Sequence, residues 1–269
     1  MKFSLKSLLA IAVASSALVL SGCGEKEVDT SKIKVGVMAG AEEQVAEVAV
    51  KVAKEKFGLE VELIIFSDYV TPNAALDDGS IDINAFQHKP YLDQQIADRG
   101  YKLAIAGNTF VYPIAGYSKQ VKSVEEIQDG SRIAVPNDPT NLGRSLLLLE
   151  QQGLLKLRED IGLLATVRDI VENPKNITIV ELDAAQLPRS LDDVTLAVIN
   201  NTYASSIDLT PQRDGIFVED KESPYVNIIV AREDNLNAEN VTNFVKAYQS
   251  EEVYTAASEI FKGGVAKGW

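Results

Sequence analysis

The stretch KIKVGVMAGAEEQVAEVAVKV, residues 32–52, changes its hydrophobic period once, at Gly40. Before Gly40, Ile33, Val35 and Val37 alternate with other residues, which predicts a β-strand. After Gly40, apolar residues recur at helical spacing, at positions 45, 48, 49 and 52. The stretch therefore predicts a strand, a turn and an amphipathic helix, which is the repeating unit of α/β proteins.

The same alternation continues on the C-terminal side of this unit. Gly58 is expected to end the helix, because glycine readily adopts the left-handed conformation that closes helices. The elements predicted next are a strand over Leu59–Phe66, a helix over Pro72–Asp78, a strand over Ile81–Phe86, a helix from about Pro90 to Arg99 and a strand over Leu103–Ala106. Strands that alternate with helices imply a mainly parallel sheet.

A second set of alternating elements follows the first. Ser123 and Glu126 form a capping-box pair, which predicts a short helix ending at Gly130. The elements predicted after it are a strand over Arg132–Val135, a helix over Asn141–Gln152, a strand over Ile177–Glu181, a short helix over Ala184–Ser190 and a strand over Leu196–Ile199. Two α/β sets of similar size indicate two lobes.

Two β-rich segments, Phe110–Ser118 and Tyr225–Ala231, are placed to carry the chain between these lobes. A C-terminal helix from about Ala238 to Phe261 is expected to pack back on the first lobe. The resulting lobes are residues 32–115 with 224–269 (lobe 1) and residues 116–223 (lobe 2).

The N-terminus has the features of an export signal. Lys2 and Lys6 precede an apolar run from Leu8 to Leu20, which is short for a membrane span. The run ends in Leu20-Ser21-Gly22-Cys23, which resembles a bacterial lipobox. The alternative is an ordinary secretory signal followed by an unrelated cysteine.

The lipobox resemblance implies that residues 1–22 are a signal peptide and that Cys23 is acylated. Two or three acyl chains are needed for durable anchoring, because a single chain holds a protein only marginally in a bilayer. Residues 23–31 are polar and without hydrophobic periodicity, and they are expected to form a flexible tether between the lipid bilayer and the fold.

Composition limits the classes of function. Without residues 1–22 the chain has 247 residues and a formal net charge of −15, since the removed segment carries two lysines and no acid. Such a negative charge argues against nucleic acid or anionic lipid as a partner. Cys23 is the only cysteine and His88 the only histidine, so neither a disulfide nor a transition-metal site is expected.

The sequence lacks the motifs of nucleotide binding and of covalent catalysis. Gly36 and Gly40 do not form a GxGxxG motif, and no GxxxxGK[ST] motif occurs. No serine lies in a GxSxG elbow, and an acylated Cys23 cannot act as a nucleophile. We therefore expect no cofactor and no enzymatic activity, although a secreted α/β enzyme remains the alternative class for this fold.

Arg144 is a candidate for binding an anionic group. It lies one turn into the helix that follows the strand Arg132–Val135, and ligands of open α/β sheets bind beyond the carboxyl ends of strands. A guanidinium near a helix N-terminus is poorly placed for helix stability, whereas a bound carboxylate there would be favourable. The alternative is that Arg144 pairs with a nearby acid such as Asp138.

Aromatic side chains gather at the same ends of the predicted strands. Phe86, His88 and Tyr91 lie within six residues, and Tyr69 follows the second strand. Together they could wall an apolar slot with polar edges, and sulfur atoms of thioethers pack favourably against aromatic rings. The alternative is that these four side chains are ordinary core aromatics.

Three runs of sequence resemble the NlpA lipoprotein family. They are FQHKPYL (residues 86–92), PNDPTNLGR (residues 136–144) and SPYVN (residues 223–227). The resemblance extends from about Lys32 to Trp269. It implies an α/β, two-lobed periplasmic-binding-protein fold, type II-like, in which each lobe is a mainly parallel sheet with flanking helices and the ligand lies in the interlobe cleft.

The resemblance also implies a binding site for methionine. Arg144 would grip the α-carboxylate, helped by Asn141 and the helix N-terminus, while Asn200 and Asn227 would hold the amino and carboxylate groups. Strand alternation allows only one of Asn200 and Asn201 to face the cleft, and we expect Asn200. The thioether would be enclosed by Tyr69, Phe86, His88 and Tyr91.

The partners implied are the permease and the ATPase of an ABC importer, to which the protein would deliver methionine. The protein would be lipid-anchored in the cell envelope and face the periplasm, with the inner membrane favoured for an importer. The sequence leaves D- versus L-methionine open. The alternatives are a methionine-containing dipeptide, a methionine derivative, and a surface-interaction lipoprotein.

Overall fold

Strand β1 and helix α1 form the unit expected around Gly40. Strand β1 (Lys32–Met38) is followed by α1 (Ala41–Phe57), which buries Val45, Ala49 and Val52 against the core. Gly58 ends α1 in the left-handed conformation, with φ of 67°. The computed structural model describes residues 29–220 and 224–269, so the expected signal peptide, Cys23 and the tether through residue 28 lie outside the described residues.

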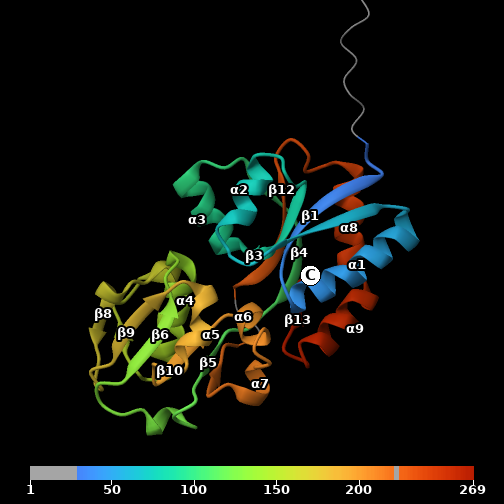
Figure 1. The fold of residues 1–269 in the computed structure, drawn as a ribbon. Coiled ribbons are helices and arrows are strands. Elements are labelled where there is room, and N and C mark those ends of the chain that lie inside the picture. Colours follow the sequence, from blue (N-terminus) through green and yellow to red (C-terminus); the bar gives the residue numbers. More distant parts are fainter. Residues whose placement is uncertain (1–28, 221–223) are drawn as a thin grey trace, which may run out of the picture.

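The strands form a larger and a smaller sheet, which occupy separate halves of the molecule (Figure 1). The larger sheet contains, in spatial order, β13 (Ala266–Lys267), β4 (Leu103–Val111), β12 (Val226–Arg232), β3 (Ile83–His88), β1 and β2 (Glu60–Phe66). The smaller sheet contains β11 (Phe217–Val218), β5 (Ala115–Tyr117), β10 (Leu196–Ile199), β6 (Arg132–Pro136) and β9 (Thr178–Leu182). A short antiparallel pair, β7 (Lys156–Leu157) and β8 (Ile170–Glu172), lies beside the smaller sheet.

Helices cover both sheets, so the expected α/β class is confirmed. The larger sheet packs α1, α8 (Glu239–Tyr248) and α9 (Glu251–Ile260) on one face and α2 (Thr71–Asp77) and α3 (Lys89–Arg99) toward the other (Figure 1). The helices associated with the smaller sheet are α4 (Pro139–Gln151), α5 (Leu187–Ser190), α6 (Asn201–Ser205) and α7 (Pro211–Asp214). Single 3-10 turns occur at Val124–Glu126, Gly162–Leu164, Val167–Asp169 and Ala184–Gln186.

The two sheets share one topology. In the larger sheet β1 lies between β2 and β3, and in the smaller sheet β6 lies between β9 and β10. The three strands run parallel in both sheets. An antiparallel strand follows in each sheet: β12 lies between β3 and β4 in the larger sheet, and β5 lies between β10 and β11 in the smaller. The sheets are therefore mixed, with the parallel part at one side, and the chain joins them through the segment between β4 and β5 and again between β11 and β12.

Four predicted element boundaries need correction. The expected strand at 81–86 is β3 at Ile83–His88, because the N–H of Ile81 bonds the carbonyl of Ala75 at the end of α2. The expected C-terminal helix is two helices, since Ser250 accepts a hydrogen bond from the N–H of Val253 and starts α9 anew. The segment 123–130 holds only one 3-10 turn, and the strand expected to end at Ala106 continues to Val111.

Three hydrophobic clusters each belong to one sheet and its helices, and a fourth lies between the two halves. This fourth cluster combines Met38, Phe86 and Tyr91 from the larger-sheet half with side chains such as Ile199 and Tyr203 from the smaller-sheet half. Both halves contribute apolar side chains to this cluster, and the removal of their surface from water holds the two halves together in this structure.

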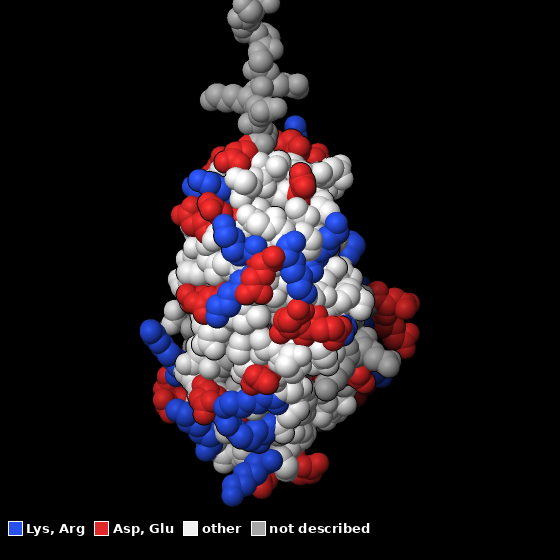
Figure 2. Space-filling model, turned by 90° about the vertical axis from the view of Figure 1, so that its right-hand side faces the viewer, with Lys and Arg blue, Asp and Glu red and all other residues white. Residues whose placement is uncertain are grey.

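Charged side chains of both signs are interspersed on the face that carries α1 and α9 (Figure 2). Pairs such as Lys56 with Glu252 and Lys267 with Glu251 link neighbouring elements there. Over residues 29–220 and 224–269, no helix has both the length and the apolar composition needed to cross a membrane.

Candidate functional site

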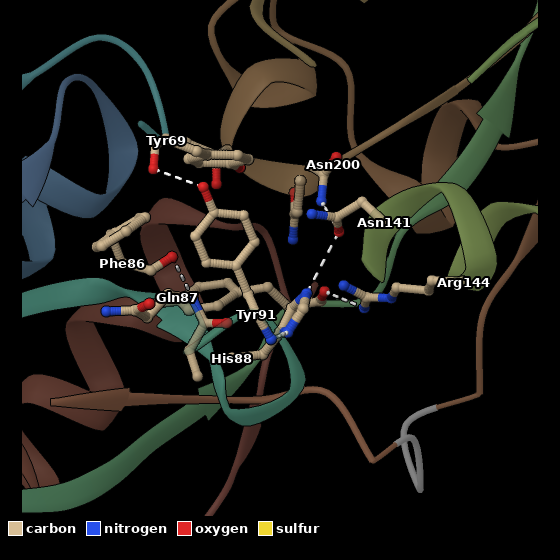
Figure 3. A pocket seen from close by; sticks show the side chains of 12 residues that line it. Tyr69, Phe86, Gln87, His88, Tyr91, Asn141, Arg144 and Asn200 are labelled. Atoms are coloured by element: carbon tan, nitrogen blue, oxygen red, sulfur yellow. Dashed lines mark hydrogen bonds between the residues drawn. The ribbon is translucent and has the colours of Figure 1, made fainter. Parts of the chain in front are cut away.

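A pocket lies where the ends of β3, β10 and β12 face helices α3, α4 and α6. The side chains leave about 360 Å³ of space between them, including space open to solvent. All eight expected ligand-binding residues line this pocket (Figure 3). The residues that line it are Tyr69, Phe86, Gln87, His88, Tyr91, Tyr112, Asn141, Arg144, Asn200, Asn201, Thr202 and Asn227.

Aromatic rings form one end of the pocket. The ring centroids of Tyr69 and Phe86 are 5.9 Å apart, and those of Phe86 and Tyr91 are 6.0 Å apart. The hydroxyl of Tyr91 donates to the carbonyl of Tyr69 at 2.7 Å, which fixes the helix α3 ring against the turn before α2. Phe86 and Tyr91 also belong to the cluster between the two halves, so they are core aromatics and pocket walls at once.

His88 ends β3 and caps the N-terminus of α3. Its Nδ1 accepts a hydrogen bond from the N–H of Tyr91 at 3.1 Å, so the ring proton is on Nε2. Nε2 can then donate to Oδ1 of Asn141, 3.3 Å away. Burial, with a further contribution from the charge of Arg144, lowers the pKa of His88 to about 3, so the imidazole is neutral at pH 7.

Asn141 connects three parts of the site. Its amide nitrogen donates to the carboxylate of Asp138, the N-cap of α4, and its Oδ1 accepts from Nδ2 of Asn200 at 2.9 Å. The N–H groups of Asn141 and Leu142 are also bonded to Asp138. The start of α4 is therefore already capped by an acid, and Asn141 organises the pocket polar groups rather than presenting a free amide.

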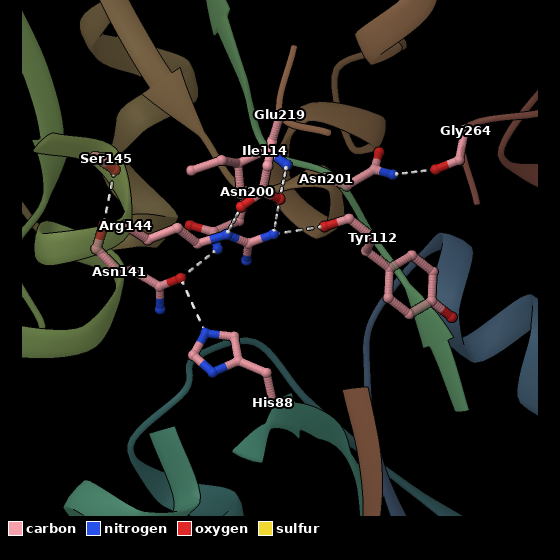
Figure 4. A network of polar contacts seen from close by, with 10 residues as sticks. All are labelled: His88, Tyr112, Ile114, Asn141, Arg144, Ser145, Asn200, Asn201, Glu219 and Gly264. Carbon is pink, nitrogen blue, oxygen red and sulfur yellow. Dashed lines mark hydrogen bonds and ion pairs between the residues drawn. The ribbon is translucent and has the colours of Figure 1, made fainter. Parts of the chain in front are cut away.

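Arg144 forms an ion pair, but its partner is Glu219 and not Asp138 (Figure 4). Nε of Arg144 donates to Oε1 of Glu219 at 2.8 Å, and Nη2 donates to Oε2 of Glu219 and to the carbonyl of Tyr112. The guanidinium also lies over the ring of Tyr225, 4.4 Å from its centroid. Nη1 is the guanidinium nitrogen that forms no hydrogen bond with the described residues.

The asparagines after β10 behave differently from the expectation. The strand ends at Ile199, so strand alternation does not apply, and both Asn200 and Asn201 line the pocket. Nδ2 of Asn201 donates to the carbonyl of Gly264, whereas Oδ1 of Asn200 is buried without a partner among the described residues. Asn227 on β12 pairs with His88 in register, and its Nδ2 donates to the carbonyl of Phe86.

Three pocket residues besides Asn201 were not expected from the sequence. Gln87 belongs to a buried amide cluster with Asn73 and Asn84, which holds α2 against β3. Tyr112 lies in the segment between β4 and β5, and Thr202 is the second residue of α6. Tyr112 directly follows β4, and Thr202 comes three residues after the end of β10; these positions were the available signal, since side chains at strand ends meet at the cleft.

The family model for the NlpA lipoprotein matches residues 33–269. The chain belongs to the NlpA lipoprotein family. It is 81% identical to the "Probable D-methionine-binding lipoprotein MetQ" of Vibrio cholerae serotype O1, over the full length of both chains.

Solved structures of related proteins have the same fold as this chain. A nutrient binding protein from Burkholderia cenocepacia bound to methionine has a TM-score of 0.86 at 51% identity, covering 88% of this chain and 100% of that one. A periplasmic substrate-binding protein of an ABC transporter from Coxiella burnetii has a TM-score of 0.86 at 49% identity, with the same coverage.

These relatives confirm two expectations for the NlpA family member. The fold is the two-lobed periplasmic-binding-protein fold, as the shared sheet topology and the similar structures require. The protein is a binding protein and not an enzyme, because its close relatives are substrate-binding lipoproteins.

Proposed function

We propose that the protein captures methionine in this pocket and delivers it to the permease and ATPase of an ABC importer. The observation that carries the proposal is the pocket itself, which has an aromatic end and an end rich in amide groups around Arg144. The named relatives support it, since one is called probable D-methionine-binding and another was solved with methionine bound.

The amide-rich end suits the charged groups of an amino acid. Nη1 of Arg144 and the Asn227 amide group can approach an α-carboxylate, and Oδ1 of Asn200 is an acceptor for an ammonium group. A buried polar atom without a partner costs about 1–3 kcal/mol, so a ligand that bonds Asn200 recovers that free energy. Recognition of the polar groups therefore sets the requirement for an amino acid.

The aromatic end suits a thioether side chain. Burial of a methionine side chain contributes roughly 1.5–3 kcal/mol, and each sulfur–ring contact adds about 0.3–1.5 kcal/mol. Tyr69, Phe86 and Tyr91 supply rings at centroid separations close to 6 Å, which form a wall and not a collapsed stack. A linear apolar side chain of the same length, such as norleucine, would lose only the sulfur contribution.

The moving parts of this binding cycle are the two halves described above. We propose the lobes expected from the sequence, residues 32–115 with 224–269 and residues 116–223, with Ala115 reassigned because it pairs with Ile199 in the smaller sheet. The cleft between them would open to admit methionine and close on it.

We further propose that acylated Cys23 anchors the protein to a membrane facing the periplasm, with the inner membrane as the site of function. Tethering near the permease raises the effective concentration of the loaded protein at its partner. The proposed tether, residues 23–31, would give the fold reach from the bilayer.

Calorimetry with the full chain in detergent tests the ligand. L-methionine is expected to bind more tightly than leucine, and norleucine to lie between them; D-methionine, methionine sulfoxide and glycylmethionine then rank the alternatives. Asn200→Ala is expected to weaken L-methionine binding by at least about tenfold, whereas Asn237→Ala, at an exposed position, leaves it unchanged. The absence of methionine binding by the unmodified chain would leave the surface-interaction lipoprotein as the better assignment.

A further inference from the structure

Glu42 is a buried acid beside the pocket that the proposed function does not yet use. It is the second residue of α1 and is only 2% exposed. Burial raises its pKa to about 8, and a hydrogen bond from Thr202 partly opposes this rise. Within residues 29–220 and 224–269, no Lys, Arg or His forms an ion pair with Glu42.

The groups around Glu42 are hydroxyls from several elements. Tyr69, Tyr112, Tyr203 and Tyr248 lie close enough to interact with its charge, from the turn before α2, the segment after β4, α6 and α8 respectively. None of these groups is a cation at neutral pH. A carboxylate at this position would therefore be buried without a counter-charge, which is strongly unfavourable.

The contact between Glu42 and Thr202 joins the two halves of the molecule. Oγ1 of Thr202, on α6 of the smaller-sheet half, donates to Oε1 of Glu42 on α1. A hydroxyl has one proton to donate and two lone pairs to accept with. Because the proton of Thr202 points to Glu42, the hydroxyl can offer only lone pairs to the pocket that Thr202 lines.

A second acceptor lies two residues earlier in the chain. Oδ1 of Asn200 is buried in the pocket wall without a partner among the described residues, and the whole residue is 7% exposed. Nδ2 of Asn200 is fixed by Asn141, so its oxygen cannot be exchanged for a donor without loss of that bond. The cation of the pocket, Arg144, is already paired with Glu219.

Oδ1 of Asn200 and the Thr202 hydroxyl are two fixed acceptors, and Glu42 is an acid without a cation beside it. Together they suit a ligand group that is positively charged and donates hydrogen bonds. We propose that Glu42 is a positioning residue for the ligand's α-ammonium group: it orients the Thr202 hydroxyl as an acceptor and, by losing its proton when the ammonium group binds, supplies the negative charge that makes the pocket prefer a free amino group. This inference rests on the proposed function and concerns the same pocket.

Glu42→Gln tests the proposal, because it keeps an oxygen that Thr202 can bond but removes the acid. Calorimetry at about pH 7 compares methionine with 4-(methylthio)butanoate, which has the carboxylate and the thioether but no amino group. We expect Glu42→Gln to weaken methionine binding by at least about tenfold and to leave 4-(methylthio)butanoate binding unchanged. Glu47→Gln, at an exposed position on the same helix, is the matched control and should bind both as the unmodified chain does.

Proton release is a readout that a merely structural role would not alter. A bound ammonium lowers the pKa of a neighbouring acid, so methionine binding at about pH 7 should release protons from Glu42. Calorimetry in two buffers of different ionisation enthalpy should detect this release in the unmodified chain and in Glu47→Gln, and not in Glu42→Gln.

Thr202→Val and Thr202→Ser provide variants that leave Glu42 in place. Thr202→Val should lose the preference for methionine over 4-(methylthio)butanoate, and Thr202→Ser should restore it. Equal loss of both ligands in Glu42→Gln, or unchanged proton release, would overturn the inference. Failure of the unmodified chain to bind methionine would instead overturn the proposed function.

Discussion

His88 Nε2 and Asn141 Oδ1 lie 3.3 Å apart and join the two halves of the molecule across the pocket. His88 comes from the end of β3 in the larger sheet, and Asn141 comes from the first turn of α4 beside the smaller sheet. The same oxygen accepts a hydrogen bond from Nδ2 of Asn200, so one amide side chain bonds donors from two strand ends (Figure 4).

Replacement of Asn141 by alanine should remove this coordination. Asn141→Ala loses the contacts to His88 and Asn200 and leaves both donors buried without their acceptor, each at a cost of about 1–3 kcal/mol. We expect methionine affinity to fall by at least about tenfold, measured by calorimetry. Asn237→Ala controls for the loss of an exposed amide, and equal affinities in the two variants would contradict the role given to Asn141.

His88 should remain neutral at every pH between about 5 and 8. Its folded-state pKa of about 3 lies below the ordinary value of 6.5, so stability linked to His88 is full above about pH 6.5 and is lost as pH falls toward 3. Because His88 is the only histidine, its ring signals are unambiguous in NMR spectra. A midpoint near 6 in their titration would contradict the buried, neutral imidazole.

Loss of Arg144 should affect folding as well as binding. Arg144→Ala leaves Glu219, whose side chain is 11% exposed, without its ion-pair partner, and breaking such a pair typically costs about 3–5 kcal/mol. In urea denaturation, Arg144→Ala should therefore be less stable than the double variant Arg144→Ala/Glu219→Ala. Strictly additive effects of the two substitutions would show that the pair contributes nothing beyond its members.

Gly143 fixes the position of α4. A Cβ atom at this residue would lie 2.2 Å from the carbonyl oxygen of Leu163 and 3.0 Å from the backbone nitrogen of Ala165, and neither can move like a side chain. Gly143→Ala should lower the free energy of unfolding by about 1–3 kcal/mol and weaken methionine binding, because α4 carries Asn141 and Arg144. Gln151→Ala on the exposed face of α4 should change neither quantity.

The lipid anchor can be tested through Cys23. Cys23→Ser removes the thiol that the lipobox resemblance marks for acylation, so the protein should no longer co-sediment with membranes after cell fractionation. Methionine binding by the released protein should be unaltered, since Cys23 lies ahead of the fold. Continued sedimentation of the variant with the membrane fraction would favour a different mode of attachment.

Local sequence patterns predicted most of the fold because strand and helix periodicity is a local property. The β1–α1 unit, the end of α1 at Gly58 and the strand Leu196–Ile199 are where the hydrophobic spacing placed them. The errors occurred where a tertiary contact or a cap decides a boundary. Ser250 divides the C-terminal helix, and antiparallel pairing with β12 lets β3 continue to His88.

The pocket residues could be predicted because they follow strand ends and match family motifs, but their partners could not. Glu219 lies 75 residues from Arg144 in the chain, and no spacing rule links the two. Glu42 falls on the first turn of an amphipathic helix, where an acid ordinarily faces solvent. Only the packing of α6 against α1 reveals that this acid is buried beside the pocket.

The placement of β12 has a consequence for how the protein matures. This strand, from near the C-terminus, lies between β3 and β4, which are close together in the sequence. A chain that has been synthesised only as far as β11 contains every strand of the smaller sheet. Its larger sheet still lacks β12, the strand that pairs with both β3 and β4. Non-local pairings of this kind form late. The protein therefore becomes able to hold a ligand only after β12 has been made, and a product truncated ahead of Val226 would lack both this strand and the pocket residue Asn227.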